Sequence, residues 1–369
     1  MMLPIAKPIL RVAGFAASLI LYALTILGAY GGRFNTDIFT FPSVLVLILP
    51  WLATATLIVT IIWFCLKRIL PGVLGVLAVI ASWGPISTVS PIALSKEPKQ
   101  GAETFTLLTY NMIHGWDQEN KPSTSNRTVQ YILSTDADIV CLQECMNLDL
   151  NGDIPGLTQA QYDSIRERYP YILGDKKYDI KLLSKYPARY VPGTNYITQP
   201  YDKRRYCFFK VNVKGREMTV IGVHLMSFML TEKEREVVTE IRSVETAKES
   251  YSELKTDIRD KLTQGFRRRK RDSEILREVI DTIKGPLLIC GDFNDVPESY
   301  AYRLIRGTDM KDAYVETGFG PLITYNQHAF WFHLDQILYR GDLRALSVKK
   351  GKTKVSDHYP LLAEFEFTK

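Results

Sequence analysis

The sequence has few cysteines, no internal repeat and no low-complexity tract. It has five cysteines in 369 residues, and their spacing matches no zinc or iron–sulfur ligand pattern. Cys141, Cys207 and Cys290 lie within apolar runs, where a small buried hydrophobic side chain is the usual interpretation. A disulfide among them stays open if this part of the chain lies outside the cytoplasm. The lack of repeats excludes solenoid and propeller architectures.

Acidic side chains are nearly absent from the first 100 residues, which contain only Asp37 and Glu97 against seven lysines and arginines. This region therefore carries +5 of the chain's net charge of +6. The rest of the chain is close to neutral. Such a balance does not indicate a basic surface for binding nucleic acid.

Three apolar segments in this region are each long enough to span a bilayer, which takes about 20 residues. They are Val12–Tyr30, Phe41–Leu66 and Val73–Leu94, with Pro50 and Pro71 expected at a kink and a turn. A cleaved signal peptide would explain only the first segment. We predict three transmembrane helices within residues 1–95, followed by a polar linker at 96–103.

Basic residues around these segments predict their orientation in the membrane. Lys7 and Arg11 precede the first segment and Lys67-Arg68 lie in the second loop, which favours a cytoplasmic N-terminus. Three spans then place residues 95–369 outside the cytoplasm, on the periplasmic side if the organism is bacterial. Lys96 and Lys99 weigh weakly against this orientation.

From Thr104 onward, short apolar runs alternate with helical stretches such as Thr128–Leu133. The turns between runs are often short, as at Val213–Arg216, which suits antiparallel hairpins. Many strands with few crossover helices predict an α/β fold of two packed sheets. The expected strands are Phe105–Tyr110, Ile139–Leu142, Ile180–Leu183, Tyr206–Val213, Met218–Val223, Leu287–Cys290, Leu334–Tyr339 and Leu361–Phe367.

The stretch at about 231–284 departs from this pattern and predicts a helical insertion. Apolar residues recur at helical spacing from Val237 to Phe266, and again from Ile275 to Ile283, which predicts a long helix and a short one. The basic run Arg267–Arg271 lies between them and is expected to end the first helix. We favour a solvated run; the alternative is contact with anionic lipid or a polyanionic substrate.

Polar residues follow several predicted strands. Asp292 and Asn294 come directly after Leu287–Cys290 and lie on one side of an extended chain. Phosphate ester hydrolysis requires a metal, a base that activates water, and groups that orient the phosphoryl centre. Carboxylates suit Mg²⁺ or Mn²⁺, and a histidine paired with an aspartate suits the base. The candidate residues are Asn111, Glu144, His224, Asp292, Asn294, Asp335, Asp357 and His358.

Taken in order, these motifs resemble the endonuclease/exonuclease/phosphatase superfamily, to which DNase I belongs. They are Thr-Tyr-Asn111, Gln-Glu144, Val-His224-Leu, Gly-Asp292-Phe-Asn294-Asp, Leu-Asp335-Gln-Ile and Ser-Asp357-His358-Tyr-Pro. The resemblance covers about residues 104–369, the expected catalytic domain. It implies a four-layer sandwich of two mainly antiparallel sheets flanked by helices, with Mg²⁺ or Mn²⁺ bound at one edge.

The resemblance also implies metal and phosphate contacts. Glu144 corresponds to the principal metal ligand, with Asn111 on metal or phosphate and Asp357 as a further metal-side carboxylate. Asp292 and Asn294 correspond to the pair that positions the attacking water and the scissile phosphate, with Asp292 also near the metal.

Histidine roles follow from the same resemblance. His358 corresponds to the catalytic histidine, oriented by Asp335. His224 matches a second histidine of the DNase I and sphingomyelinase branches, where it aids the leaving group or holds phosphate. His333 stands where many members carry arginine, and Lys181 interrupts a run that is often small and apolar. We expect His114 and His333 to be structural or supporting residues.

We therefore expect a membrane-anchored, metal-dependent phosphoesterase acting on a lipid or small soluble phosphate ester, either a diester or a monoester. The alternative is a DNase I-like nuclease acting on DNA or RNA, which the basic run Arg267–Arg271 supports. A binding module without activity is a third and weaker alternative. If the protein is a nuclease, we expect a basic rim around the site; if it is a lipid esterase, we expect an apolar rim. We infer no protein partner.

Overall fold

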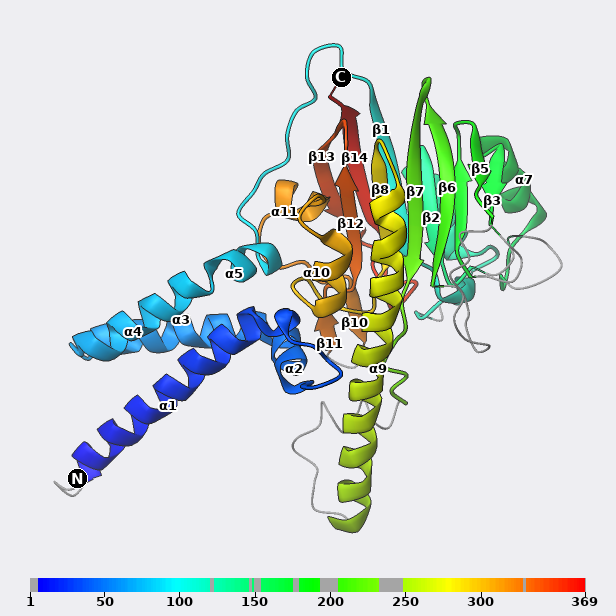
Figure 1. The fold of residues 1–369 in the computed structure, drawn as a ribbon. Coiled ribbons are helices and arrows are strands. Elements are labelled where there is room, and N and C mark those ends of the chain that lie inside the picture. The colour runs from blue at the N-terminus through cyan, green and yellow to red at the C-terminus, as the bar shows by residue number, and fades with distance from the viewer. Residues whose placement is uncertain are drawn as a thin grey trace.

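The computed structural model describes residues 6–119, 123–145, 148, 154–174, 179–192, 205–231, 248–327 and 330–368. Two six-stranded sheets pack face to face (Figure 1). The first has the order β13-β14-β1-β2-β4-β3 and the second β5-β6-β7-β8-β12-β9. In each sheet one pair of strands is parallel, β1–β2 or β7–β8, and the other described pairs are antiparallel. The predicted mainly antiparallel sheets are confirmed.

The strands of the first sheet are β1 (Thr104–Asn111), β2 (Ile139–Gln143), β3 (Tyr171–Leu173), β4 (Lys181–Ser184), β13 (Leu343–Lys350) and β14 (Leu361–Phe367). Those of the second are β5 (Ala188–Tyr190), β6 (Tyr206–Val213), β7 (Arg216–His224), β8 (Leu287–Asp292), β9 (Lys311–Asp312) and β12 (Asp335–Arg340). A separate hairpin joins β10 (Tyr325–Gln327) to β11 (Phe330–Phe332). All eight predicted strands are present within two residues of their expected bounds.

Alternating residues of the strands make the core between the sheets. Phe105, Cys141 and Phe365 of the first sheet pack with Phe209 and Cys290 of the second. All three expected buried cysteines, Cys141, Cys207 and Cys290, are buried free thiols, and the other two cysteines are also free. Burying such apolar surface supplies the main driving force for closing the sandwich.

Helices cover the outer face of each sheet. Helices α6 (Arg127–Thr135) and α7 (Gln159–Arg168) belong to the apolar cluster on the first sheet, and α9 (Lys248–Thr282) and α10 (Tyr300–Arg306) to the cluster on the second. A short α11 (Ala313–Thr317) follows β9. Asn126 caps α6, and Thr158 with Gln161 forms a capping box on α7, so polar side chains satisfy the first backbone amides of both helices.

The N-terminal region forms helices α1 (Ala6–Ala29), α2 (Phe41–Leu47), α3 (Leu49–Cys65), α4 (Ile69–Ala81) and α5 (Trp83–Val89), with a 3₁₀ turn η1 (Gly31–Arg33). One helix, over Arg11–Ala29, is long and apolar enough to cross a membrane. The pairs α2–α3 and α4–α5 pass the same test only when joined, and they bend by 74° and 63°. The expected single segments Phe41–Leu66 and Val73–Leu94 are therefore each divided, the first just before Pro50.

Helix α9 runs without a break through the basic run Arg267–Arg271. The prediction that this run ends one helix and separates it from a second is wrong, because arginine and lysine are good helix formers. The N-terminal part of the predicted helix, from Val237 to residue 247, lies outside the described residues.

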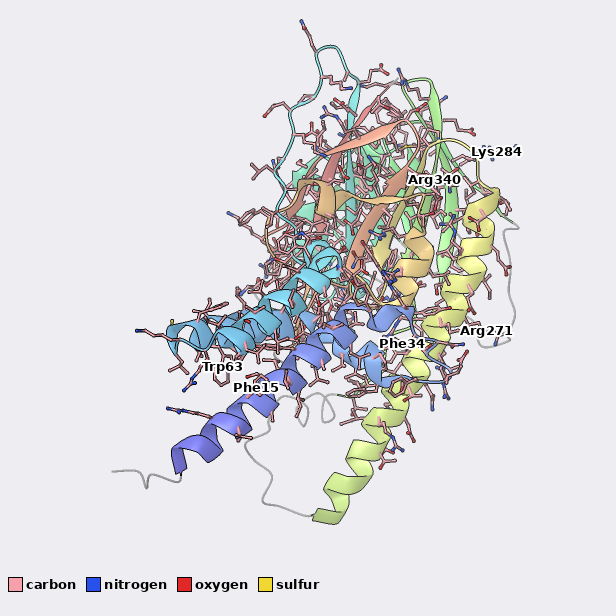
Figure 2. All side chains as sticks on the ribbon, turned by 60° about the vertical axis from the view of Figure 1, so that its left-hand side comes forward. Phe15, Phe34, Trp63, Arg271, Lys284 and Arg340 are labelled. Atoms are coloured by element: carbon pink, nitrogen blue, oxygen red, sulfur yellow. The ribbon has the colours of Figure 1, made fainter. Side chains whose placement is uncertain are left out.

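Part of the basic run binds the protein itself. Arg269 is completely buried and pairs with Asp295 at 2.9 Å between Nε and Oδ2. Lys270 pairs with Asp37 of the loop after η1 at 2.7 Å, and the Arg267 guanidinium donates to the Asp37 carbonyl. The prediction of a solvated run is wrong for Arg269 and Lys270. Figure 2 shows this part of α9, around Arg271, beside the N-terminal loop that carries Phe34.

Residues 96–103, the predicted linker, lie against the catalytic domain. Lys96 donates its backbone N–H to Leu346 and pairs with Glu316 at 2.9 Å. The backbone N–H of Lys99 donates to Glu366 at 2.8 Å. These contacts tie the segment to the outer strand β13 and its surroundings.

Candidate active site

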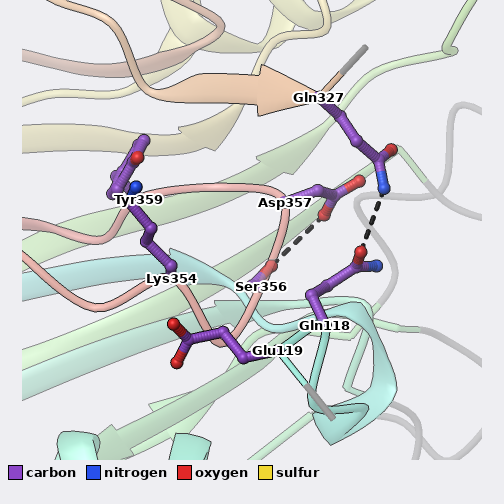
Figure 3. Close-up of a pocket in the computed structure, with 7 residues that line it drawn as sticks. All are labelled: Gln118, Glu119, Gln327, Lys354, Ser356, Asp357 and Tyr359. Atoms are coloured by element: carbon purple, nitrogen blue, oxygen red, sulfur yellow. Dashed lines mark hydrogen bonds between the residues drawn. The ribbon is translucent and has the colours of Figure 1, made fainter.

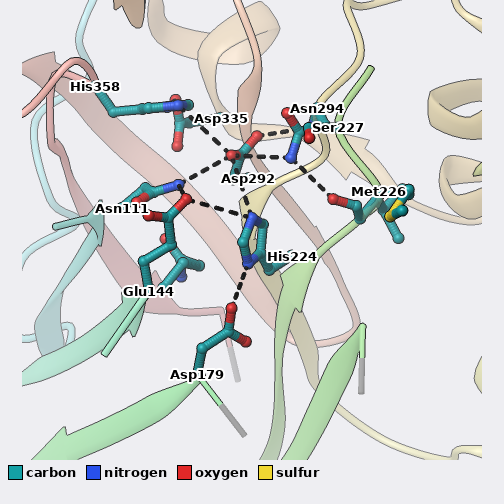
Figure 4. Close-up of polar contacts among 12 residues, drawn as sticks. Asn111, Glu144, Asp179, His224, Met226, Ser227, Asp292, Asn294, Asp335 and His358 are labelled. Carbon is teal, nitrogen blue, oxygen red and sulfur yellow. Dashed lines mark hydrogen bonds and ion pairs between the residues drawn. The ribbon is translucent and has the colours of Figure 1, made fainter. Parts of the chain in front are cut away.

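The predicted site residues meet at the ends of the central strands (Figure 4). Asn111 ends β1, His224 ends β7 and Asp292 ends β8, while Asp335 begins β12. Because β7 and β8 are parallel and β12 is antiparallel to β8, the register places both His224 and Asp335 opposite Asp292. The strand order thus brings together residues more than 100 positions apart.

Asp292 is the centre of the site and is 1% exposed. Its Oδ2 accepts hydrogen bonds from the side-chain amides of Asn111 at 3.1 Å and Asn294 at 3.2 Å. Its Oδ1 accepts from the backbone N–H of Asn294 at 2.7 Å. Burial raises the pKa of Asp292 to about 6, even though the charge of His358 acts in the opposite direction.

His358 and Asp335 form one histidine–carboxylate pair. His358 Nδ1 lies 2.8 Å from Asp335 Oδ2, and His358 Nε2 lies 3.6 Å from Asp292 Oδ2. Burial alone would lower the pKa of His358, but the charges of Asp335 and Asp292 outweigh it and raise the pKa to about 10. The imidazole therefore carries a positive charge at neutral pH in this arrangement.

His224 and Asp179 form a second pair on the other side of Asp292. His224 Nδ1 lies 2.9 Å from Asp179 Oδ2, and Nε2 lies 3.9 Å from Asp292 Oδ2. Burial opposes the charged form of His224, but the hydrogen bond to Asp179 and the charge of Asp292 prevail and raise its pKa. Two imidazoles thus approach one carboxylate oxygen, each oriented by its own aspartate.

Sequence reasoning missed Asp179. The predicted site residues are polar residues at the ends of strands, whereas Asp179 lies two residues before β4 begins. The available signal was an acid directly before the apolar Ile180, in a segment that also contains the unusual Lys181. Lys181 itself is buried in β4.

Glu144 lies beside Asn111 and directly after β2. The side-chain amide of Asn111 donates to Glu144 Oε1 at 3.1 Å, so this amide bridges Glu144 and Asp292. The other oxygen, Oε2, lies 3.8 Å from Nε2 of His114. Both Glu144 and Asn294 have positive φ, a backbone conformation that often marks functional positions.

Asp357 faces a pocket of about 270 Å³ next to the site (Figure 3). The hydroxyl of Ser356 donates to Asp357 Oδ1 at 3.3 Å and also to the Asn111 carbonyl at 2.8 Å. Burial raises the pKa of Asp357, and the charge of Glu144 acts in the same direction. The two carboxylates are therefore close enough to repel each other, an arrangement that a bound cation relieves.

Two sets of side chains fit a metal ion. Among the described residues, Asp292, Asp335 and His358 offer three ligand atoms within 4.8 Å of one another. The His358–Asp335 hydrogen bond already uses one atom of each partner. The oxygen donors of Glu144, Asn111 and Asp357 leave that pair intact, and hard oxygen ligands are what Mg²⁺ and Mn²⁺ prefer.

Comparison with known proteins adds a family match. The model of the Endonuclease/Exonuclease/phosphatase family matches residues 108–358. No curated protein sequence matches the chain. The match includes every predicted site residue and its motif order.

Solved structures of low identity resemble the chain. Humanized TDP2 from D. rerio has 15% identity and a TM-score of 0.44, covering 71% of this chain and 98% of its own. Sphingomyelinase C from Streptomyces griseocarneus has 15% identity and a TM-score of 0.40, covering 71% and 99%. An endonuclease/exonuclease/phosphatase family protein from Leptotrichia buccalis has 16% identity and a TM-score of 0.45, covering 71% and 100%. Because the family model matches more than half of the sequence, the chain belongs to the endonuclease/exonuclease/phosphatase family.

Proposed function

We propose that this protein is a membrane-anchored, metal-dependent hydrolase of phosphate esters, and that its substrate is a lipid. The observation that carries the proposal is the convergence of two histidine–aspartate pairs on Asp292, beside Asn111 and Asn294. Phosphoryl transfer depends on positioning and charge stabilisation, and this cluster supplies both from rigid strand ends.

Each of these residues has a separate role in the reaction. Asp292, with a pKa of about 6, is suited to hold the attacking water and accept its proton. The water oxygen forms a bond to phosphorus as the ester bond breaks. The protonated His358 binds a phosphoryl oxygen, and His224 donates a proton to the leaving oxygen. One water is consumed, yielding an alcohol and a phosphate product.

Glu144, Asn111 and Asp357 would hold Mg²⁺ or Mn²⁺, with Asp292 at its edge. A bound divalent ion neutralises the charge that develops on the phosphoryl oxygens. Asn111 would then help to hold either the ion or the phosphate, and Asn294 would fix the orientation of Asp292.

The membrane anchor is α1 together with the bent pairs α2–α3 and α4–α5, counted as three spans. Lys7 and Arg11 in the first turns of α1, and Lys67 and Arg68 between α3 and α4, favour a cytoplasmic N-terminus, which puts the catalytic domain outside the cytoplasm. Substrate in the same membrane would then reach the site without leaving the bilayer surface.

Exposed apolar side chains that lie close in sequence to site residues favour a lipid over a nucleic acid. Trp116, Met229 and Trp331 are 61%, 61% and 51% exposed. Each lies within five residues of a site residue: Trp116 after Asn111, Met229 after His224, and Trp331 before Asp335. The basic run that supported the nuclease alternative contributes Arg269 and Lys270 to internal pairs instead. A DNase I-like nuclease is the second candidate.

The test is hydrolysis by the full chain in nanodiscs. The panel contains sphingomyelin, glycerophospholipids, a soluble aryl phosphodiester, plasmid DNA and RNA, each with Mg²⁺, with Mn²⁺ or with chelator. Metal-dependent turnover of a lipid with intact DNA supports the proposal. Nicking of DNA without lipid turnover replaces it with the nuclease.

Replacing the central residues should abolish turnover without unfolding the protein. We expect His358→Ala and Asp292→Ala each to lower kcat by about 10³-fold or more, because these side chains act on the reacting groups. Circular dichroism checks the fold, and Asp260→Ala, exposed on α9, is the matched control. Activity close to wild type in either variant contradicts the proposed mechanism.

A further inference from the structure

We propose that the pocket beside Asp357 binds a second anionic group of the substrate, in addition to the phosphate that is cleaved. The group is a phosphate or carboxylate on the headgroup of a lipid phosphate ester. The binding element is the lysine loop, Lys349–Lys354, which carries four lysines in six residues. This inference rests on the proposed function and narrows its substrate.

The lysine loop leads directly into the site. It connects the end of β13 to Ser356, Asp357 and His358, and all four of its lysines are exposed. Lys354 lines the 270 Å³ pocket together with Tyr359 and Asp357 (Figure 3). Lys350 Nζ lies 4.4 Å above the centroid of the Tyr359 ring, which holds a second ammonium group near the same pocket.

The pocket also offers neutral hydrogen-bonding groups. Gln118 and Gln327 both line it, and the side-chain amide of Gln327 donates to Gln118 Oε1 at 3.0 Å. Amides and a tyrosine beside lysines suit the hydroxyls and the charged group of a polar headgroup. An apolar acyl chain would find no match in this lining.

The charge of the lysine loop is not neutralised by the protein. No ion pair joins its four lysines to a carboxylate within the described part of the chain. Glu119, which also lines the pocket, pairs with Arg127 at 2.6 Å. Asp357 is the remaining acid in the lining, and we assign it to the metal. Four uncompensated cations beside a phosphoesterase site create a local potential that attracts an anion.

The described loops after His224 and Asp292 contain no lysine or arginine. The loop at 225–231 is Leu-Met-Ser-Phe-Met-Leu-Thr, and the loop after Asp292 contains Asp295 and Glu298 but no base. Nucleic-acid binding uses about 6–10 phosphate contacts spread along a track. One basic loop, together with exposed apolar residues near the site, instead fits an amphiphile with a compact anionic headgroup.

Kinetics with two lipids test the inference. The full chain in nanodiscs is assayed on phosphatidylinositol 4-phosphate, which carries a second phosphate, and on phosphatidylcholine, whose headgroup has no second anion. We expect Lys352→Gln/Lys354→Gln to raise KM for the first lipid about tenfold, with kcat and the phosphatidylcholine KM little changed. Lys311→Gln is the matched control, because Lys311 is an exposed lysine of β9 that pairs with Tyr339 near the far end of β12. Equal effects on both lipids, or none, overturn the inference.

A binding measurement separates this inference from the proposed function. Calorimetry with the inactive His358→Ala chain measures affinity for soluble glycerophosphoinositol 4-phosphate, inorganic phosphate and a single-stranded DNA. We expect the double lysine variant to weaken binding of the headgroup about tenfold. Unchanged headgroup binding overturns the inference, and so does equal affinity for inorganic phosphate or a selective loss of DNA binding. Headgroup binding that depends on the lysines, in a wild-type chain that cleaves no ester, supports the pocket and overturns the proposed function alone.

Discussion

At the scale of single residues, the site depends on which side-chain atoms already form hydrogen bonds within it and which remain available for further contacts. Asp335 and Asp179 each give Oδ2 to a histidine, and their Oδ1 atoms have no hydrogen-bond partner among the described residues. A hydrogen bond to Nδ1 fixes the ring and directs Nε2 of each histidine at Asp292. Each aspartate thus acts through its histidine.

Asp179 is a positioning residue whose effect should disappear when His224 is absent. We expect Asp179→Asn to lower kcat by about 10²-fold and to shift the pKa of His224 downward, because the amide carries no charge. The pH profile of kcat reports that shift. His224→Ala/Asp179→Asn should be no slower than His224→Ala, since the two residues act as a unit. Additive losses contradict the assignment.

His333 makes folding stability depend on pH. Burial lowers its pKa to about 4, and its Nδ1 has no hydrogen-bond partner among the described residues. At a pH between the pKa of His333 in the unfolded chain and its lower pKa in the folded chain, His333 binds a proton in the unfolded chain but not in the folded one. Stability is therefore full above the unfolded value and falls as the pH decreases toward 4.

His333→Gln should reduce that dependence. From about pH 7 to about pH 5 we expect the variant to lose about 2 kcal/mol less stability than wild type, measured by denaturant unfolding in detergent. Every other titrating group is common to both proteins, so the difference between the curves isolates His333. Parallel curves contradict the prediction.

At the scale of elements, α9 braces two loops of the site. Arg269 of α9 donates to the Met226 carbonyl in the loop after His224 and pairs with Asp295 in the loop after Asp292. Its guanidinium lies 4.1 Å from the ring centroid of Phe228 and 5.2 Å from that of Phe266. The Asn294 side chain joins the same loops by donating to the Leu225 carbonyl.

Removing the charge of Arg269 alone should destabilise the protein more than removing the charges of both Arg269 and Asp295. Arg269→Met leaves Asp295 buried and unpaired, and we expect it to cost about 3–5 kcal/mol of stability. Arg269→Met/Asp295→Asn should recover more than half of that loss, because the amide keeps the contact with Val296 N–H without a buried charge. Thermal unfolding of both variants measures the difference. No recovery in the double variant contradicts this account.

At the scale of the whole molecule, the N-terminal helices and the catalytic domain share one apolar cluster. Val46 and Leu47 of α2 pack with Phe266 of α9, with Val296 of the loop after β8, and with Leu334 directly before β12. The Lys270–Asp37 pair lies beside this cluster. The N-terminal helices therefore support the loops of the site.

Gly32 is a point of close contact between the two parts, and enlarging it should disturb both. A Cβ at Gly32 would lie 2.0 Å from the backbone oxygen of Glu298, just before α10. We expect Gly32→Ala to cost about 1–3 kcal/mol of stability and to reduce lipid turnover. Gly84→Ala in α5 is the matched control, since a Cβ there meets nothing within 4 Å. Equal behaviour of the two variants in thermal unfolding and activity contradicts the shared interface.

Local patterns predicted the strands because each is a short apolar run bounded by turn residues. Val213–Arg216 forms the expected hairpin turn, with positive φ at Lys214 and Gly215. Most of the strands that were not predicted, such as β3, β5 and β9, have two or three residues and too few positions for a period to appear. The exception is β13, which has eight residues and was not predicted either. The basic run was misjudged because the burial of Arg269 depends on Asp295, a partner supplied by a distant loop.

The sequence by itself determined the order of the motifs, the family, the eight main strands and the apolar N-terminal segments, because these depend on residues close together in the chain. The tertiary structure decided that Asp179 orients His224, that Arg269 lies inside the protein, and that α2 packs against the site loops. Each of these rests on a contact between residues far apart in sequence, where burial removes the competing water and makes one pairing more stable than the rest.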